Sequence, residues 1–440
     1  MLKRIKIKGY KSLVAVDVSL RPLSVLFGPN AAGKSNFLDA LQLLSRIATS
    51  RTLKDAFEPP YRGKPLESFT FGDSGIKGLL AQETASFSIE ADVELSKPIM
   101  ETVNRQIREM KMKKTETSGE NSESEVKTQL LPPVRERYLR YRIEIEILPK
   151  SGILRVSDEY LAALNAEGEI NKKRNPFLEK VRNRLHLRME GQAHPTYHEC
   201  NLDHSILSIP LYPPHYPHLA AMRQEFASWF FFYFDPRERM RAPNAVKEVR
   251  HIGLMGEELA SFLNTLRALD EPQFKAVEKA LHMIIPNVTG IEVGANDLGE
   301  VELKLLEGKT PIPARVLSEG TLRVLGLLAL GGAKEPPALL GFEEPENGIH
   351  PRRIRMIADL LKGRTATGDT QLIVTTHSPI LPDMISDENL YICRKEQGHT
   401  MIEPFSTLGA LWRSTDIDKA LDTEEKLCTS ERILRGDFDA

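Results

Sequence analysis

The sequence predicts an α/β fold in which a mixed sheet is interrupted by a long, mainly helical insertion. Near the amino end, an apolar strand runs into a glycine-rich loop and then an amphipathic helix. From about residue 288 onward, strand and helix patterns alternate again. We therefore expect one nucleotide-binding domain in two parts, 1–95 and 288–440, with an inserted lobe at 96–287.

The amino-terminal elements follow from hydrophobic periodicity. Residues 2–8 alternate between apolar and basic side chains, and 23–27 form a short apolar run that ends in glycine, so both segments predict strands. In the segment 36–48, apolar residues recur at spacings of three and four, which predicts an amphipathic helix. Strand, glycine loop and helix are thus expected in that order.

The inserted lobe begins and ends less clearly. Segments 86–95 and 138–148 alternate as half-buried strands, and the polar residues 111–129 between them predict a flexible linker. The region 155–285 is expected to be mostly helical around the aromatic run 229–234. That run favours a buried strand over a base-stacking platform, because its continuous apolarity suits burial on both faces.

The composition excludes several classes of protein. The 59 basic and 61 acidic side chains give a formal charge of −2, so contact with nucleic acid needs a local patch. The cysteines, Cys200, Cys393 and Cys428, lack the spacing of a zinc or redox site. No run of about eighteen apolar residues occurs, so we expect a cytoplasmic protein without a membrane span.

The loop that follows residue 27 reads GPNAAGKSN and fits the pattern G-x-x-x-x-G-K-[S/T]. In such a loop glycines let backbone N–H groups approach phosphates, the lysine reaches the β and γ oxygens, and the serine coordinates Mg²⁺. The sequence therefore predicts binding of a nucleotide with Mg²⁺, and we expect the nucleotide to contact Gly28, Asn30, Gly33, Lys34, Ser35 and Asn36.

Two further segments supply chemistry to such a site. The apolar strand 339–342 delivers Glu343 and Glu344, where the first acid is expected near the metal with Ser35 and the second as general base. A second strand ends in the segment TTHSP, whose His377 is expected to face the γ-phosphate. Without the glycine loop, either segment would more often be a structural feature than part of a catalytic site.

A fourth segment, LSEGT at 317–321, precedes the apolar helix LRVLGLLAL and resembles the signature motif of ABC-type ATPases. Together with the glycine loop, FEEPENGIHP and TTHSP, it resembles the group that includes SMC and RecF-like proteins. The more similar relatives are the OLD-like and AAA-type ATPases of bacterial anti-phage defence. The resemblance implies an ABC-type ATPase head, with Ser318 and Gly320 contacting the γ-phosphate held by a second subunit.

The resemblance also implies partners. A composite site of this kind implies a homodimer or a higher even-numbered homo-oligomer. The inserted lobe lacks heptads for the long coiled coil of SMC proteins. The chain ends about sixty residues after His377, which is too few for the TOPRIM nuclease domain of OLD proteins. We therefore expect a separately encoded effector, a nuclease or toxin, controlled by an ATP-hydrolysing sensor and scaffold.

A second function remains open from the sequence, that of a RecF-like or SMC-like DNA-binding ATPase of repair. The segment 172–188 holds seven basic side chains and one acidic one, and a helix from Pro176 would align Lys180, Arg184 and Arg188. A nucleic-acid contact and a solvated charged face fit this segment equally well. A transporter subunit fits less well, because the GYKS opening and the ENGIHP loop argue against it.

Overall fold

The computed structural model describes residues 1–72, 74–118, 133–192, 194–332, 337–366, 368–406 and 428–435. The chain forms two compact units, and each is built from separate stretches of sequence. The first unit comprises Met1–Leu20, Asn36–Trp229 and Lys395–Ile402, and the second comprises Arg21–Ser35, Phe230–Arg394 and Glu403–Ala440. No helix in the described ranges combines the length and the apolar composition that a membrane span requires.

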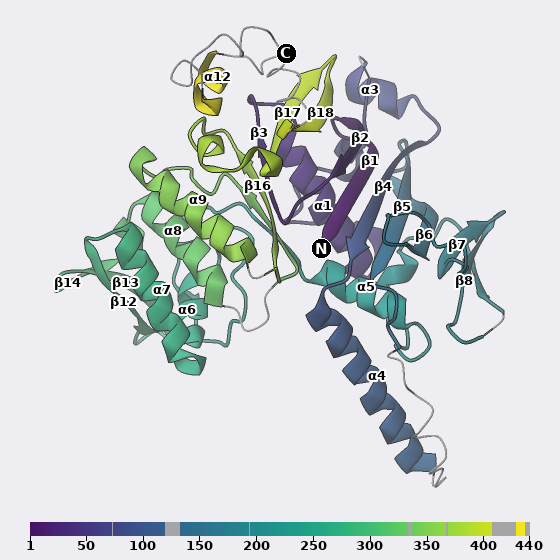
Figure 1. The fold of residues 1–440 in the computed structure, drawn as a ribbon, viewed down its shortest axis with the longest axis horizontal. Helices are drawn as coiled ribbons and strands as arrows, with labels where there is room; N and C mark the ends of the chain where they lie inside the picture. The colour runs from purple at the N-terminus through teal and green to yellow at the C-terminus, as the bar shows by residue number, and fades with distance from the viewer. Residues whose placement is uncertain are drawn as a thin grey trace. The chain divides into compact units, whose positions relative to one another are not determined.

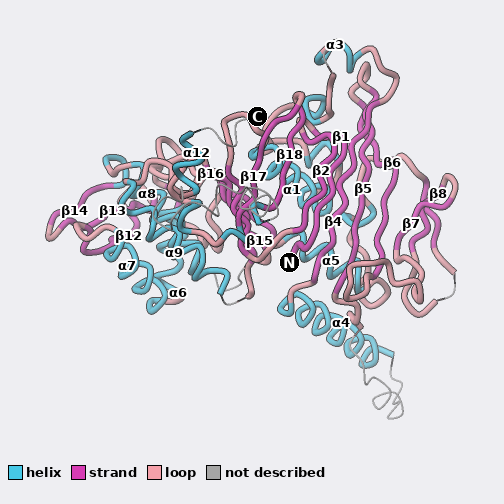
Figure 2. Tube along the Cα trace, turned by 45° about the horizontal axis from the view of Figure 1, so that its top comes forward, coloured by secondary structure: helices cyan, strands magenta, loops and turns pink. Residues whose placement is uncertain are grey.

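The first unit contains an eight-stranded sheet in the order β2-β1-β4-β5-β6-β7-β8-β9 (Figures 1 and 2). Its antiparallel strands are β1 Leu2–Tyr10, β2 Leu13–Ser19, β4 Ala85–Glu94, β5 Tyr138–Leu148, β6 Ile153–Ala163, β7 Leu178–Val181, β8 Arg184–Leu187 and β9 Thr196–Glu199. Alternate residues of β5 are buried, which explains why its apolar and charged residues alternate.

The helices of the first unit are α1 Lys34–Thr49, α2 Leu53–Ala56, α3 Gly75–Leu80, α4 Lys97–Ser118 and α5 Pro217–Ala227. The first two residues of α1 belong to the second unit's segment Arg21–Ser35. The start of α4 buries Val103 and Ile107, and α4 contacts α5. Farther along, α4 extends away from the sheet of its own unit (Figure 1).

The second unit contains most of a six-stranded sheet in the order β10-β15-β16-β3-β17-β18; the first unit's segment Lys395–Ile402 supplies the greater part of β18. Its strands are β3 Leu23–Phe27, β10 Trp229–Phe232, β15 Leu339–Glu343, β16 Gln371–Thr376, β17 Leu390–Glu396 and β18 His399–Pro404. The neighbours β15, β16, β3 and β17 run parallel, and β3 and β16 are buried along their whole lengths. Parallel strands of this kind are covered on both faces, which their continuous apolar runs reflect.

A smaller sheet lies in the same unit and consists of β11 Asn244–Ala245, β12 Val288–Ala295, β13 Glu300–Glu307 and β14 Thr310–Pro313. The helices of this unit are α6 Leu259–Leu269, α7 Glu271–Ile284, α8 Glu319–Ala329, α9 Pro351–Ala366 and α12 Thr429–Arg435. Helix α6 contacts both β12 and β13, and α7 contacts β12 and α8. One core of buried apolar side chains joins these helices to the strands.

Several predictions about local structure are confirmed. The strands expected at 2–8, 23–27, 86–95 and 138–148 are β1, β3, β4 and β5, and the helix expected after the glycine loop is α1. The aromatic run begins with β10, whose four residues are buried or half-buried, as a buried strand requires.

The expectation of a mostly helical region at 155–285 is wrong for residues 155–199, where β6 to β9 extend the first unit's sheet. The three outermost strands are only four residues long and carry charged side chains, so they lack a readable period. The unit boundaries also differ from the expected domains, because 21–35 and 230–287 fold with the carboxyl-terminal segment.

Two smaller expectations also need correction. Helix α4 continues through Ser118, so the first part of the expected linker 111–129 is helical, and its remainder lies outside the described residues. The helix expected from Pro176 is absent in favour of the hairpin β7–β8. Arg182 adopts a left-handed φ of 57° at the two-residue turn of this hairpin, as tight turns between antiparallel strands require.

Candidate functional site

The predicted site residues gather at one edge of the second unit's parallel sheet. Strand β16 pairs with β15 on one side and with β3 on the other, in parallel register throughout. The carboxyl ends of parallel strands meet at one edge of the sheet, which is where ligands bind in open α/β folds. The glycine loop after Phe27, the acids at the end of β15 and His377 after β16 therefore lie together.

The glycine loop needs its glycines for conformation and for space. Gly28 and Gly33 have φ angles of 147° and 101°, which L side chains rarely adopt. A Cβ on Gly28 would lie 1.9 Å from the carbonyl oxygen of Cys393 in β17. The loop is thus pressed onto the neighbouring strand, and Asn30 is exposed at its tip.

Lys34 begins helix α1 and folds back over the loop. Its Nζ donates hydrogen bonds to the carbonyl oxygens of Gly28 at 2.7 Å and Pro29 at 2.8 Å. Burial lowers the pKa of Lys34 to about 8, because two carbonyl dipoles do not replace the water that the ammonium loses. A bound triphosphate would give this ammonium a charged partner.

Ser35 and Glu343 are in direct contact, with the hydroxyl donating a hydrogen bond to Oε1 of the carboxylate. A hydroxyl and a carboxylate are hard oxygen ligands of the kind that Mg²⁺ prefers. Within the described residues, no group of three or more His, Cys, Asp or Glu side chains can hold a metal. The Ser35–Glu343 pair fits Mg²⁺ of the kind that few protein oxygens hold, where phosphate and water would complete the shell.

Glu344 and His377 form the next contact along this edge, 3.1 Å between Oε1 and Nε2. The other ring nitrogen, Nδ1, lies 3.2 Å from Nζ of Lys34. Burial, and then the charge of Lys34, lower the pKa of His377 below its usual 6.5. A neutral ring with Lys34 as donor to Nδ1 must carry its proton on Nε2, so it donates to Glu344.

The backbone of Glu344 is strained, with φ at 50° directly after β15. Left-handed conformations are costly for residues with a Cβ and cluster at functional sites. The conformation is held by the Glu344 N–H, which donates to the carbonyl of Thr375 at 2.9 Å. The turn separates the two adjacent acids, so that Glu343 meets Ser35 and Glu344 meets His377.

Glu346 is a buried acid of this site that the sequence reasoning did not include. It is 6% exposed, and its Oε1 accepts a hydrogen bond from the hydroxyl of Thr376. Its Oε2 is buried and has no hydrogen-bond partner in the described part of the chain. Burial raises its pKa. The third acid of the segment FEEPE is the feature of the sequence that could have indicated Glu346 as a site residue.

The signature segment packs against the loop that follows the acids. Ser318 is the N-cap of α8, where its hydroxyl accepts a hydrogen bond from the Thr321 N–H at 3.2 Å. A Cβ on Gly320 would lie 2.3 Å from the carbonyl oxygen of Gly348. Arg323 of α8 also donates to the carbonyl of Asn347 at 2.9 Å. Ser318 itself is exposed to solvent.

The remaining predicted residues make none of the contacts described above. Asn36 belongs to the first unit, where its amide donates to the hydroxyl of Ser12 at 2.8 Å. In the basic segment 172–188, Arg174 pairs with two glutamates and Arg188 with Glu179. The predicted helical stripe of Lys180, Arg184 and Arg188 is therefore wrong, since strands carry these residues and one is neutralised.

Comparison with known families gives a match over most of the second unit and part of the first. A model of the family described as "AAA domain, putative AbiEii toxin, Type IV TA system" matches residues 23–97 and 203–383. The OLD nuclease of Thermus scotoductus is 23% identical over 410 residues, which cover 91% of this chain and 63% of the relative. These similarities agree with an OLD-like, ABC-type P-loop ATPase.

Solved structures of SMC heads also align with the chain. An SMC head bound to the C-terminal winged-helix domain of ScpA is 13% identical, with a TM-score of 0.48 over 91% of this chain and 96% of that one. The SMC head domain from Thermotoga maritima is 15% identical, with a TM-score of 0.41 over 92% of this chain and 98% of that one.

Proposed function

Because the chain belongs to the family of AAA domains described as putative AbiEii toxins of type IV toxin–antitoxin systems, we propose that it binds and hydrolyses ATP with Mg²⁺. One observation carries the proposal. The pairs Ser35–Glu343 and Glu344–His377 lie side by side at the ends of adjacent parallel strands, next to the glycine loop. A hydrolytic phosphoryl transfer needs this combination of phosphate cradle, metal ligands and base.

Each residue has a defined task in this reaction. The loop N–H groups and Lys34 hold the phosphates, and Ser35 with Glu343 would hold Mg²⁺, which neutralises phosphate charge when bound. Glu344 accepts the proton of the attacking water. His377, which donates to Glu344, fixes the direction of that carboxylate.

We assign the signature segment to a second copy of the chain. The amino end of α8 presents N–H groups and a positive dipole end, which favour an anion. Ser318 is exposed at this end of α8, and its hydroxyl caps the helix by accepting a hydrogen bond from the Thr321 N–H. Two chains would then enclose two ATP molecules in a homodimer or a higher even-numbered homo-oligomer, with Ser318 and Gly320 against the partner's γ-phosphate.

The role that this ATPase fits best is that of a sensor and scaffold in anti-phage defence, controlling a separate nuclease or toxin. The family description names a toxin–antitoxin system, and the curated relative is named a nuclease. This chain spans 63% of that relative's length. We assign the phosphate site to this chain and propose that a separate polypeptide carries the destructive activity.

A DNA-binding repair ATPase is the second candidate, and one observation favours it. The hairpin β7–β8 and the segment that precedes it in the chain expose five basic side chains. They are Lys172, Lys173, Lys180, Arg182 and Arg184. Such a cluster can contact phosphates, and binding of this kind weakens steeply with salt.

The test is ATP turnover against protein concentration, with and without duplex DNA, for the intact chain and for Glu344→Gln. The defence scaffold predicts turnover that rises as chains associate, is lost in the variant and ignores DNA. Stimulation by DNA that fades with salt, and disappears in the double variant Arg182→Glu/Arg184→Glu, would instead establish the repair ATPase. Absence of turnover in the intact chain at every concentration would overturn the proposed function itself.

A further inference from the structure

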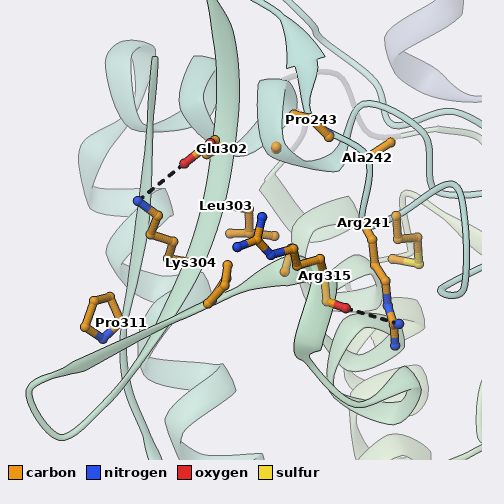
Figure 3. A pocket seen from close by; sticks show the side chains of 12 residues that line it. Arg241, Ala242, Pro243, Glu302, Leu303, Lys304, Pro311 and Arg315 are labelled. Carbon is orange, nitrogen blue, oxygen red and sulfur yellow. Dashed lines mark hydrogen bonds and ion pairs between the residues drawn. The ribbon is translucent and has the colours of Figure 1, made fainter. Parts of the chain in front are cut away.

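A pocket of about 390 Å³ lies in the second unit, along strand β13 of the small sheet. Its apolar wall comes from Met240, Ala242, Pro243, Pro311 and Pro313, and its polar groups come from Arg241, Glu302, Lys304 and Arg315. Leu303 of β13 and Arg315 both line the pocket (Figure 3).

The pocket coincides with an interruption in the sheet edge. Strand β12 accompanies β13 along one side from Val301 to Glu307. On the other side, β11 pairs only with Glu300 and Val301, and β14 pairs only from Lys304 onward. Among the described strands, none pairs with Leu303 on this side. The interval from 301 to 304 is roughly 10 Å, which admits about two residues of an added strand.

The pairing register shows which backbone groups face the interruption. In β14, Pro311 and Pro313 lack N–H groups, so the pairs they form with β13 cannot be the doubly hydrogen-bonded ones. The hydrogen-bonded pairs must then be those of Leu305 and Glu307, and such pairs alternate along an antiparallel edge. The N–H of Val246, which donates to the Gly299 carbonyl at 3.1 Å, follows the same alternation. Leu303 therefore directs its N–H and C=O into the pocket.

The charges around the pocket favour an acidic occupant. Glu302 is already engaged, by Lys304 at 3.3 Å and by the Asn296 amide at 3.2 Å. Arg315 is exposed, and no salt bridge joins it to a described carboxylate, although its charge, after the contacts from Asn296 and Lys304, helps to lower the pKa of Glu302. Three cations against one occupied carboxylate leave the pocket positive, and arginine recognises a carboxylate with two parallel hydrogen bonds.

Arg241 connects this pocket to the signature segment. Its guanidinium donates to the carbonyl of Leu317 at 2.7 Å and to that of Arg315 at 3.3 Å. Leu317 directly precedes Ser318, the N-cap of α8. The Nε of Arg241 is buried and has no hydrogen-bond partner among the described residues, so this guanidinium has an unused donor.

We propose that this pocket binds an extended acidic segment of a partner polypeptide, which adds a short strand beside Leu303 and places a carboxylate on Arg315. Backbone pairing supplies the affinity and the carboxylate supplies the selectivity, as in other cases of strand addition. The inference rests on the proposed function in that the partner is the separate effector. Docking at the pocket would then reach the signature segment through Arg241.

The experiment uses the full chain and fluorescein-labelled Thr-Val-Glu-Val-Asp-Val, followed by fluorescence anisotropy. We expect saturable binding that Arg315→Glu weakens at least about tenfold, because the charge reversal replaces attraction by repulsion. The matched variant Lys309→Glu alters the exposed turn between β13 and β14 and should bind as the intact chain does. Circular dichroism establishes that both variants are folded.

Two altered peptides separate the elements of the proposal. A version with lysine at both acidic positions, and a version N-methylated at the central residues, should each lose most of the affinity. Full binding by the methylated peptide, or displacement of the peptide by inorganic phosphate at equal concentration, would overturn the strand addition. No binding of the acidic peptide, or equal binding by Arg315→Glu, would overturn the site.

A last variant separates this inference from the ATPase proposal. Lys34→Ala should abolish ATP turnover and leave peptide binding unchanged, because Lys34 is not part of the pocket. Peptide binding without turnover in the intact chain would leave the pocket established and the proposed ATPase function wrong. Turnover without peptide binding would leave the ATPase function established and the proposed pocket wrong.

Discussion

Glu344 and His377 are joined by a 3.1 Å contact between a carboxylate oxygen and Nε2, and Lys34 approaches the other ring nitrogen at 3.2 Å. The imidazole thus connects the base of the proposed reaction with the lysine that would hold the phosphates. Because both the ring and the ammonium are partly desolvated, the state of one depends on the other. This chain of three groups leads to the first two predictions.

Removing the imidazole should impair hydrolysis more than nucleotide binding. In His377→Ala, Glu344 loses the donor that orients it, and we expect kcat to fall by about tenfold to a hundredfold, with the Kd for ATP changed less than threefold. Glu344→Gln should remove turnover almost completely. Steady-state kinetics and equilibrium titration measure both quantities. His399→Ala, an exposed histidine in β18, should behave as the intact chain does, and a His377→Ala chain with unchanged kcat would contradict the assignment.

The affinity for ATP should depend on the protonation of Lys34. In the free protein its pKa is about 8, whereas a bound triphosphate keeps the ammonium protonated well above that value. The free protein therefore loses this proton as the pH rises through about 8 and the complex does not, so affinity is full well below pH 8 and falls above it. We expect a Kd about tenfold weaker at pH 9 than at pH 7.5.

Titration with a non-hydrolysable ATP analogue at both pH values checks this expectation. The variant Lys34→Met, which has no group to titrate, should bind weakly and equally at the two pH values. An intact chain whose Kd is the same at pH 7.5 and pH 9 would show that Lys34 does not titrate in this range.

The strain at Glu344 predicts an unusual order of stability. Two variants, Glu344→Gly and Glu344→Ala, both remove the carboxylate, but only glycine adopts a φ of 50° without strain. We expect the glycine variant to be more stable than the alanine variant by about 1 kcal/mol. Thermal unfolding of the two chains side by side measures the difference. A more stable alanine variant, the usual order in regular structure, would exclude the left-handed conformation.

The packing of α8 against the following loop predicts that a methyl group at Gly320 is harmful. The added Cβ would lie 2.3 Å from the Gly348 carbonyl, so backbone must move, and we expect a loss of about 1–3 kcal/mol together with reduced turnover. Gly363 in α9 is the matched control, because a Cβ there meets nothing within 4 Å. Gly363→Ala should keep full turnover and equal or higher stability. Equal melting temperatures for both variants would contradict this packing.

Local structure near the site followed from the sequence because each element there is continuous. The strand 23–27, the glycine loop and α1 are consecutive, and so are β15 and the acids that it carries. The loop pattern itself requires glycine at Gly28 and Gly33, where the structure has positive φ, and at Gly28 there is also no space for a Cβ. Periodicity and motif spacing contain this information directly.

Pairing between distant segments could not be predicted in the same way. Strand β3 lies beside β16, more than 300 residues later, and nothing in either apolar run specifies the other as its neighbour. The strands β7 to β9 are short and charged, so their place in the sheet depends on β6 and not on their own pattern. The burial of Glu346 against Thr376 depends on the same long-range pairing.

The central claim is that ATP is hydrolysed between the glycine loop of one chain and the signature segment of another. Mixing two inactive variants, Lys34→Ala and Ser318→Asp, tests it most directly. Aspartate keeps the N-cap of α8 and places a negative charge where the partner's phosphate would lie. Random association should restore about a quarter of the intact turnover, because half of the dimers then hold one complete site. A mixture that is as inactive as its two components would contradict the claim.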